Sequence, residues 1–138
     1  MAEGARVGGV VMFVQDLDRS VNFYADVLVL EVADRSPTAA LLSHADGANL
    51  ILRAMGHQAP HPLGSVGVQY VVWTATGEGD LARAEGALAA RGAHRETRSH
   101  EGVRLVEGRD PDGIPVMICY PGPDKRPLHD LPARIYGW

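Results

Sequence analysis

The stretch of sequence that decides the fold is Val14–Tyr24, which reads VQDLDRSVNFY. It follows an apolar run, Gly9–Val14, that predicts a buried β-strand. Asp16 is a suitable N-cap, because its side chain can accept a hydrogen bond from a free backbone N–H group in the first helical turn. Four apolar or aromatic side chains then recur along one side of a helix, which predicts an amphipathic helix: Leu17, Val21, Tyr24 and Leu28.

Three strand-like segments follow this helix, near Glu31–Asp34, Ala39–Ser43 and Asn49–Arg53. The dipeptide Asp46-Gly47 lies between the last two, and Asp-Gly is a strong signal for a hairpin turn. The first part of the chain therefore predicts a βαβββ module.

The same order of elements repeats in the second half of the chain. Val66–Thr74 predicts a strand, and Asp80-Leu81 opens a helix with Leu81, Ala84 and Leu88 on one side. Gly92 suits the left-handed residue that often ends a helix. Three further strand-like segments follow, with the turn Asp112-Gly113 before the last of them: Ala93–Arg98, Val103–Glu107 and Val116–Tyr120.

This repeat predicts an α+β fold in which one domain, residues 1–138, contains two βαβββ modules. The modules span residues 1–55 and 65–120, a linker rich in Pro and His covers 56–64, and a proline-rich tail covers 121–138. One helix and four strands bury little apolar surface, so the two modules are expected to pair their sheets.

Composition and charge argue against several classes of function. The 138 residues are 46% hydrophobic and 22% charged, which is ordinary for a globular domain. The net charge of −4, with scattered arginines, argues against nucleic-acid binding, which needs clustered positive charge. No apolar segment has the length of a signal peptide or a membrane span, and Cys119 is the single cysteine. We therefore expect a cytoplasmic protein with no membrane contact.

Two motifs resemble those of the vicinal-oxygen-chelate superfamily, which includes glyoxalases, bleomycin resistance proteins and extradiol dioxygenases. They are the segment Val14–Tyr24 and the segment Gly108–Gly113, which reads GRDPDG, and the resemblance covers residues 7–121. It implies two βαβββ modules whose mixed sheets form a cup, with the helices outside and the site on the concave face. It also implies a homodimer. Because this fold serves isomerases, dioxygenases, thiol transferases and non-catalytic drug-binding proteins, the fold alone does not decide the function.

The resemblance also implies where a metal would be bound, on the first and last strands of each module. Counting from the motifs places these positions at Gly9, Ile51, Gln69 and Met117. Gly and Ile carry no donor atom and a thioether is a poor ligand for Zn²⁺, Mn²⁺ or Fe²⁺, whereas catalytic sites need about three N or O ligands. The six histidines lie near turns, in the linker or in the tail and are interpreted as exposed polar residues. We therefore predict no metal and no other cofactor.

Strand alternation then predicts which residues share the concave face with those four positions. The face is expected to be apolar, with Val10, Met12, Val14, Tyr70 and Val72 on the opposite side. We expect Phe13 and Trp73 to stack on a ligand and Asn49, Arg53 and Gln69 to orient it. Gly9 and Pro115 also fall on this face, and the predicted ligand-binding residues are Val11, Phe13, Asn49, Ile51, Arg53, Gln69, Val71, Trp73, Met117 and Cys119.

The first hypothesis is a metal-independent binding protein of the bleomycin resistance type, which sequesters an apolar or aromatic antibiotic, another drug-like ligand or a natural product. It assigns no catalytic residue. A second hypothesis is an enzyme of the superfamily, either metal-dependent with displaced ligands or a metal-free natural-product tailoring enzyme. Asp34, Glu101 and Glu107 are candidate bases for it, and the sequence does not select among them. A third hypothesis is an interaction module with a filled cup. The alternative to a ligand cleft is a cup that has collapsed into plain core or is covered by the partner subunit.

Overall fold

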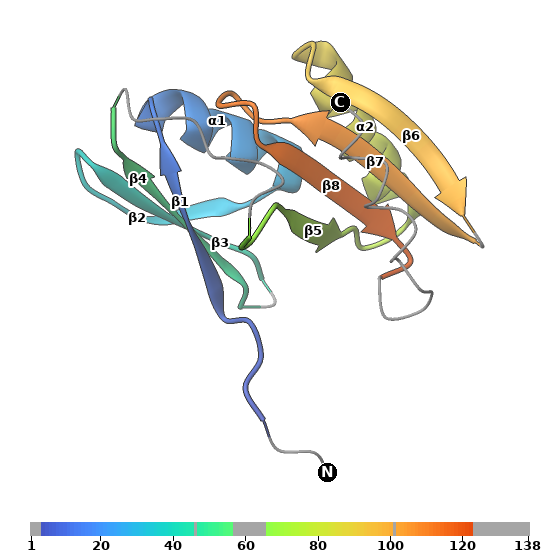
Figure 1. Ribbon diagram of the computed structural model, residues 1–138, viewed down its shortest axis with the longest axis horizontal. Helices are drawn as coiled ribbons and strands as arrows, with labels where there is room; N and C mark the ends of the chain where they lie inside the picture. Colours follow the sequence, from blue (N-terminus) through green and yellow to red (C-terminus); the bar gives the residue numbers. More distant parts are fainter. Residues whose placement is uncertain (1–3, 46, 57–65, 101, 123–138) are drawn as a thin grey trace. The chain divides into compact units, whose positions relative to one another are not determined.

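Each half of the chain folds as one helix and four strands, in the order that the sequence predicts (Figure 1). The computed structural model describes residues 4–45, 47–56, 66–100 and 102–122. The chain divides into two compact units, residues 1–59 and 60–138, and each unit contains one βαβββ module. The predicted α+β fold of two βαβββ modules is confirmed.

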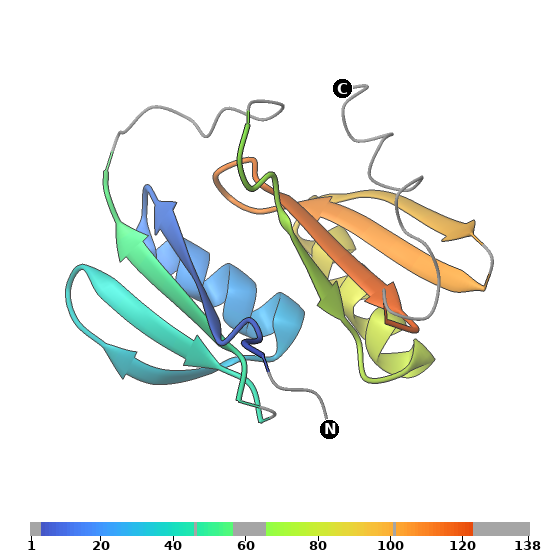
Figure 2. The same cartoon turned by 60° about the horizontal axis from the view of Figure 1, so that its bottom comes forward.

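The first module contains β1 (Gly9–Val14), α1 (Leu17–Leu28), β2 (Glu31–Arg35), β3 (Ala39–Ser43) and β4 (Asn49–Ala54). Its four strands form one mixed sheet in the order β1-β4-β3-β2, in which β1 runs parallel to β4 and the other pairs are antiparallel (Figure 2). The parallel pair follows from α1, because this helix returns the chain to the end of the sheet at which β1 began, so β2 runs in the direction of β1. Two antiparallel steps, from β2 to β3 and from β3 to β4, then give β4 the direction of β1.

The second module contains β5 (Val71–Thr74), α2 (Glu78–Ala90), β6 (His94–His100), β7 (Val103–Arg109) and β8 (Pro115–Tyr120). Its sheet has the corresponding order, β5-β8-β7-β6, with β5 parallel to β8. The strand β5 is shorter than the predicted segment Val66–Thr74, since residues 66–70 precede it. The module therefore repeats the topology of the first one with a shorter edge strand.

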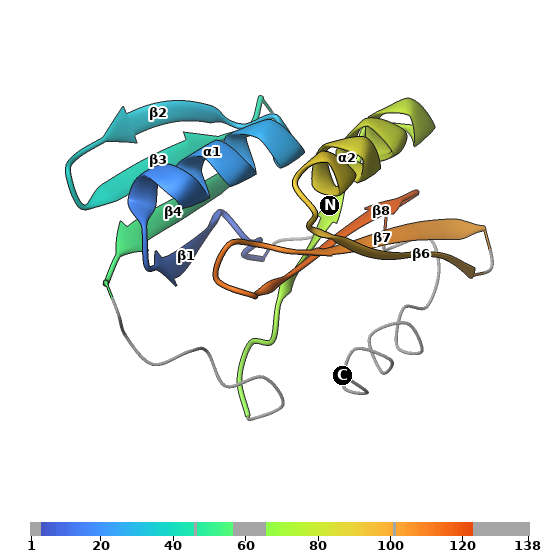
Figure 3. The ribbon, with the colours of Figure 1, turned by 90° about the horizontal axis from the view of Figure 1, so that it is seen from above.

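Each helix covers one face of its own sheet (Figure 3). In the first module the buried side chains of α1 meet buried leucines of β3 and β4, among them Leu42, Leu50 and Leu52. In the second module Leu81, Ala84 and Leu88 of α2 are buried, as the sequence predicts. Burial of one such leucine side chain contributes about 1.5–3 kcal/mol to folding, so these contacts stabilise each module.

The predicted signals at the helix ends are also confirmed. Asp16 is the N-cap of α1, and its Oδ1 accepts a hydrogen bond from the backbone N–H of Arg19 at 3.1 Å. Gly92 follows α2 with φ +66°, in the left-handed region that favours glycine. Among the described residues, neither helix has the length and apolar character needed to cross a membrane.

Candidate functional site

The face of each sheet that points away from its own helix is here called the far face, and the opposite face is called the near face. In the first module, Gly9 pairs with Asn49, Val11 with Ile51, and Phe13 with Arg53. Leu50 and Leu52 alternate with these residues and are buried on the near face. The residues of β1 and β4 that were predicted to share one face therefore lie together on the far face, as expected.

The far face of the first sheet exposes large apolar side chains. Val11 is 58% exposed and Phe13 is 63% exposed, although both lie within a strand. Leu41 of β3 pairs with Ile51 and extends the same face, and both are partly buried. Arg53 is exposed beside Phe13, and the Asn49 side-chain amide donates a hydrogen bond to the carbonyl of Gly8 at 3.2 Å. The face thus combines an apolar centre with a few polar groups.

In the second module the predicted face of β5 is wrong. Val71 pairs with Val116 and Trp73 with Ile118. Val116 also pairs with Gly108, where an added Cβ would lie 2.8 Å from Leu88 Cδ2 of α2, so these residues lie on the near face. Gln69 precedes β5, and its Nε2 donates a hydrogen bond to the carbonyl of Gly67 at 2.9 Å.

The far face of the second sheet carries Tyr70 and Val72 instead, which the sequence had placed on the opposite face. Both pack against a buried cluster of Val103, Leu105, Met117 and Cys119. Pro115, Met117 and Cys119 do lie on the predicted face of β8, where Pro115 pairs with Arg109. Cys119 is buried and, as the single cysteine of the sequence, forms no disulfide bond within the chain.

The error has a physical cause. Asp16 is the N-cap of α1, whereas Asp80 lies inside the first turn of α2, so the two aspartates are not equivalent. Gly9 lies eight residues before Leu17, the first residue of α1. The residue eight before Glu78, the first residue of α2, is Tyr70 and not Gln69. A shift of one residue along a strand moves every side chain to the other face.

The positions that correspond to the metal-binding positions of the superfamily are therefore Gly9, Ile51, Tyr70 and Met117. The first module offers no donor atom there, and the second offers a phenol and a thioether. Within the described ranges, no three His, Cys, Asp or Glu side chains gather closely enough to hold a metal ion. These side chains do not fit a divalent cation that needs about three N or O ligands.

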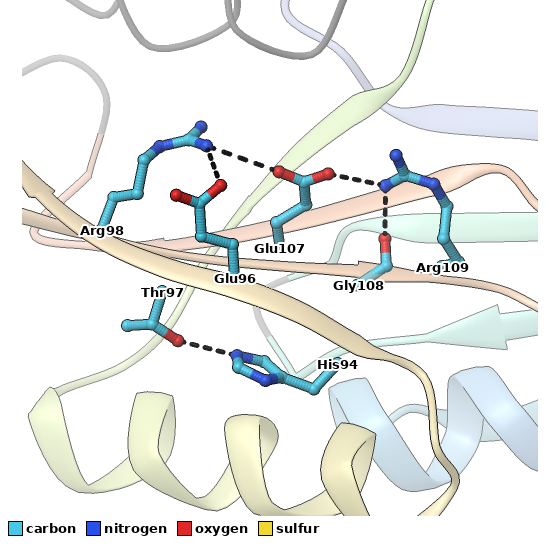
Figure 4. A network of polar contacts seen from close by, with 7 residues as sticks. All are labelled: His94, Glu96, Thr97, Arg98, Glu107, Gly108 and Arg109. Atoms are coloured by element: carbon cyan, nitrogen blue, oxygen red, sulfur yellow. Dashed lines mark hydrogen bonds and ion pairs between the residues drawn. The ribbon is translucent and has the colours of Figure 1, made fainter. Parts of the chain in front are cut away.

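A group of charged side chains lies on the far face of the second sheet (Figure 4). Glu107 of β7 pairs with Met117 on one side and with Glu96 of β6 on the other. Its Oε2 accepts a hydrogen bond from Arg109 Nη1 at 2.8 Å, and its Oε1 lies 3.6 Å from Arg98 Nη1. Arg98 Nη1 also donates a hydrogen bond to Glu96 Oε2 at 2.8 Å. We call these four residues the charged cluster.

Of the three candidate bases, only Glu107 is found buried on a far face. Asp34 is exposed on β2, where its carboxylate accepts a hydrogen bond from the backbone N–H of Arg35. Glu101 lies outside the described residues. The roles of Arg98 and Arg109 were missed, because charged residues in a strand usually indicate a solvent-exposed face.

The remaining polar residues have structural contacts. His94 Nε2 lies 2.8 Å from Thr97 Oγ1, and Thr97 hydrogen-bonds to Glu85 of α2, so this contact lies on the near face (Figure 4). Asp110 Oδ1 accepts hydrogen bonds from the backbone N–H groups of Asp112 and Ile114. The DPDG segment is therefore a turn that is held by Asp110, as expected from its sequence.

Comparisons with known proteins agree with this fold. The model of the Glyoxalase/Bleomycin resistance protein/Dioxygenase superfamily matches residues 6–118. No curated protein matches the chain. A glyoxylase/bleomycin resistance protein/dioxygenase domain from Frankia sp. EAN1pec is similar with a TM-score of 0.74 and 22% identity, over 85% of this chain and 98% of that chain.

Two further solved structures are similar to a comparable degree. A glyoxalase/dioxygenase from Nostoc punctiforme has a TM-score of 0.71 and 21% identity, over 83% of this chain and 89% of that chain. A lactoylglutathione lyase from Agrobacterium tumefaciens has a TM-score of 0.65 and 20% identity, over 86% of this chain and 95% of that chain. Identities this low show the shared fold alone. With both sequence motifs inside the matched range, the chain belongs to the glyoxalase/bleomycin resistance protein/dioxygenase superfamily.

Proposed function

We propose that this protein binds a planar, apolar small molecule without a metal ion, in the manner of a drug-sequestering bleomycin resistance protein. The observation that carries the proposal is the exposure of Val11 and Phe13 on the far face of the first sheet. Their neighbours on this face are the partly buried Leu41 and Ile51, so apolar side chains continue from β1 over β4 and β3. A contiguous apolar surface of this kind typically marks a site of interaction.

Physical chemistry supports a flat ligand. Covering apolar surface contributes about 25 cal/mol per Å², before the cost of association. The Phe13 ring offers a flat surface on which an aromatic ring can stack, and Arg53 beside it can interact with the ligand's edge or its π-face. Asn49, at the start of β4, is a further polar group at the border of this surface.

The proposed contact residues are those of the first module, namely Val11, Phe13, Asn49, Ile51 and Arg53. Met117 and Cys119 lie on a far face but are buried, and Val71 and Trp73 lie on a near face. Phe13 therefore takes the stacking role that the sequence had divided between Phe13 and Trp73. Superfamily enzymes that bind a metal need donor atoms that Gly9 and Ile51 do not supply, which is why the proposal is a binding protein.

The test is a thermal-shift screen of planar aromatic compounds on protein treated with a chelator, followed by calorimetric titration of the strongest hit. We expect Phe13→Ala to weaken that binding by about tenfold, which corresponds to about 1.4 kcal/mol. Val32→Ala is the matched control, since Val32 is an exposed apolar residue of the same sheet that pairs with Leu42 on the near face.

Equal weakening by both substitutions, or no weakening by Phe13→Ala, would contradict the proposed surface. A stoichiometric metal in the purified protein that is required for binding would contradict metal independence.

A further inference from the structure

The charged cluster is buried to a degree that charged side chains rarely reach. The side chains of Glu107, Arg98 and Arg109 are 7%, 8% and 13% exposed, whereas that of Glu96 is 43% exposed. Removing charges from water is costly, and pairs of this kind often contribute nothing to stability compared with apolar residues of similar volume. The burial of three charges therefore calls for a reason other than the stability of the sheet.

The first module serves as an internal comparison. Leu41 pairs with Ile51 in the first sheet as Glu107 pairs with Met117 in the second, so Leu41 and Glu107 hold equivalent positions. Two residues further along the strand, Ser43 is the equivalent of Arg109. A leucine and a serine thus satisfy the same topology, which indicates that this fold does not itself require the charges.

The carboxylate of Glu107 also retains the capacity to accept a hydrogen bond. Its Oε2 accepts one from Arg109, but the 3.6 Å between Oε1 and Arg98 Nη1 is an ion-pair distance and too long for a hydrogen bond. In the part of the chain that the structure describes, no donor is hydrogen-bonded to Oε1. Oε1 can therefore accept a hydrogen bond from a donor that another molecule supplies.

The charged groups around Oε1 determine which kind of ligand group can donate a hydrogen bond to it. The charged cluster contains two guanidinium groups and two carboxylates, so their formal charges cancel and favour neither a cationic nor an anionic ligand group. A neutral hydroxyl group can donate to Oε1 and accept from a guanidinium N–H group at the same time. A phenolic hydroxyl suits this position better than an alcohol, because it is the stronger donor.

We propose that Glu107, flanked by Arg98 and Arg109, is a recognition site on the second sheet for the phenolic hydroxyl of a small aromatic molecule. The phenol O–H donates to Glu107 Oε1, and the phenol oxygen accepts from Arg98. This site belongs to the second module alone and does not depend on the binding proposed for the far face of the first sheet.

A matched pair of probes tests the proposal, 2-naphthol and its methyl ether 2-methoxynaphthalene. In the ether a methyl group replaces the hydroxyl hydrogen, which removes the O–H donor and keeps the aromatic ring system. We expect the whole protein to bind 2-naphthol about tenfold more tightly than the ether, as measured by fluorescence titration. In Glu107→Leu, which introduces the residue found at position 41, we expect this preference to disappear. Val32→Ala, an exposed residue of the first module that is part of neither proposed site, should leave the preference unchanged.

Two further variants separate recognition from structure. Glu85→Gln removes a carboxylate from the near side of the same module and should retain the preference for 2-naphthol. The triple variant Arg98→Met, Glu107→Leu and Arg109→Met replaces the buried charges with apolar side chains, and it should fold with an unchanged or higher Tm and show no preference. The proposal would be overturned by equal binding of both probes to the native protein, by a preference that persists in Glu107→Leu, or by a triple variant that fails to fold.

Discussion

Val29 lies at the end of α1 with φ 54° and ψ 52°, in the left-handed region of backbone conformation. A β-branched side chain is strained there, because its Cβ approaches the following carbonyl group. After α2 the corresponding left-handed residue is Gly92, for which this conformation has no steric cost. The backbone N–H of Val29 donates to the carbonyl of Ala25, so the strained geometry also closes the last turn of the helix.

We expect Val29→Gly to raise the free energy of unfolding by about 1 kcal/mol, because the relief of strain exceeds the greater chain entropy that glycine brings to the unfolded state. Val29 is 57% exposed, so removal of its side chain sacrifices little buried surface. Urea denaturation measures the change. Gly92→Val is the reciprocal control and should lower the free energy of unfolding. A loss of stability in Val29→Gly would show that the side chain contributes more by packing than it costs in strain.

At the scale of elements, the two helices begin differently. The N-cap of α2 is Gly77, which provides no side-chain hydrogen bond. Asp80 acts in its place from the first turn, since its Oδ2 accepts from the backbone N–H of Thr76 at 3.0 Å and its Oδ1 accepts from Arg83 Nε at 3.0 Å. Burial raises the pKa of Asp80, but the hydrogen bond from Thr76 and the guanidinium of Arg83 outweigh it, so the pKa is lower than the ordinary value.

This depressed pKa predicts a pH-dependent contribution to stability. The contribution is fully present above the unfolded-state pKa of about 3.9 and is lost as the pH falls through the lower folded-state pKa. We therefore expect Asp80→Asn to lower the free energy of unfolding by about 1 kcal/mol at pH 7, and this difference should shrink below about pH 4. Urea denaturation of both proteins between pH 7 and pH 3 measures it. Glu78→Gln, an exposed carboxylate of the same turn, is the control, and a pH-independent difference for Asp80→Asn would refute the assigned role.

At the scale of the whole molecule, the exposed apolar far face of the first sheet has two possible occupants, a small ligand or a second copy of the chain. Membership of the superfamily led us to expect a homodimer, and closed two-fold dimers are the commonest oligomers. We expect light scattering after size-exclusion chromatography to give twice the 14.8 kDa mass of one chain. A monomer at micromolar concentration would contradict this expectation.

The same measurement on Phe13→Asp distinguishes the two occupants of this face. If the variant keeps the dimeric mass but loses the affinity for the planar ligand, the face binds the ligand. If the mass falls to that of one chain, the far face of the first sheet is the dimer interface, and the proposed ligand surface is wrong.

The sequence by itself determined the two βαβββ modules, because helix periodicity, the N-cap at Asp16 and the left-handed Gly92 depend only on residues close together in the chain. It also placed Val11 and Phe13 on one face of β1, since alternation within a strand is local. Only the tertiary structure decided which side chains of β5 lie on the far face. A shift of one residue in the alignment of β5 relative to the start of α2 moves every side chain of the strand to the other face. Likewise, only the pairing of β6 with β7 brings Arg98 to Glu107, since the two residues lie on different strands and their contact depends on the register between them.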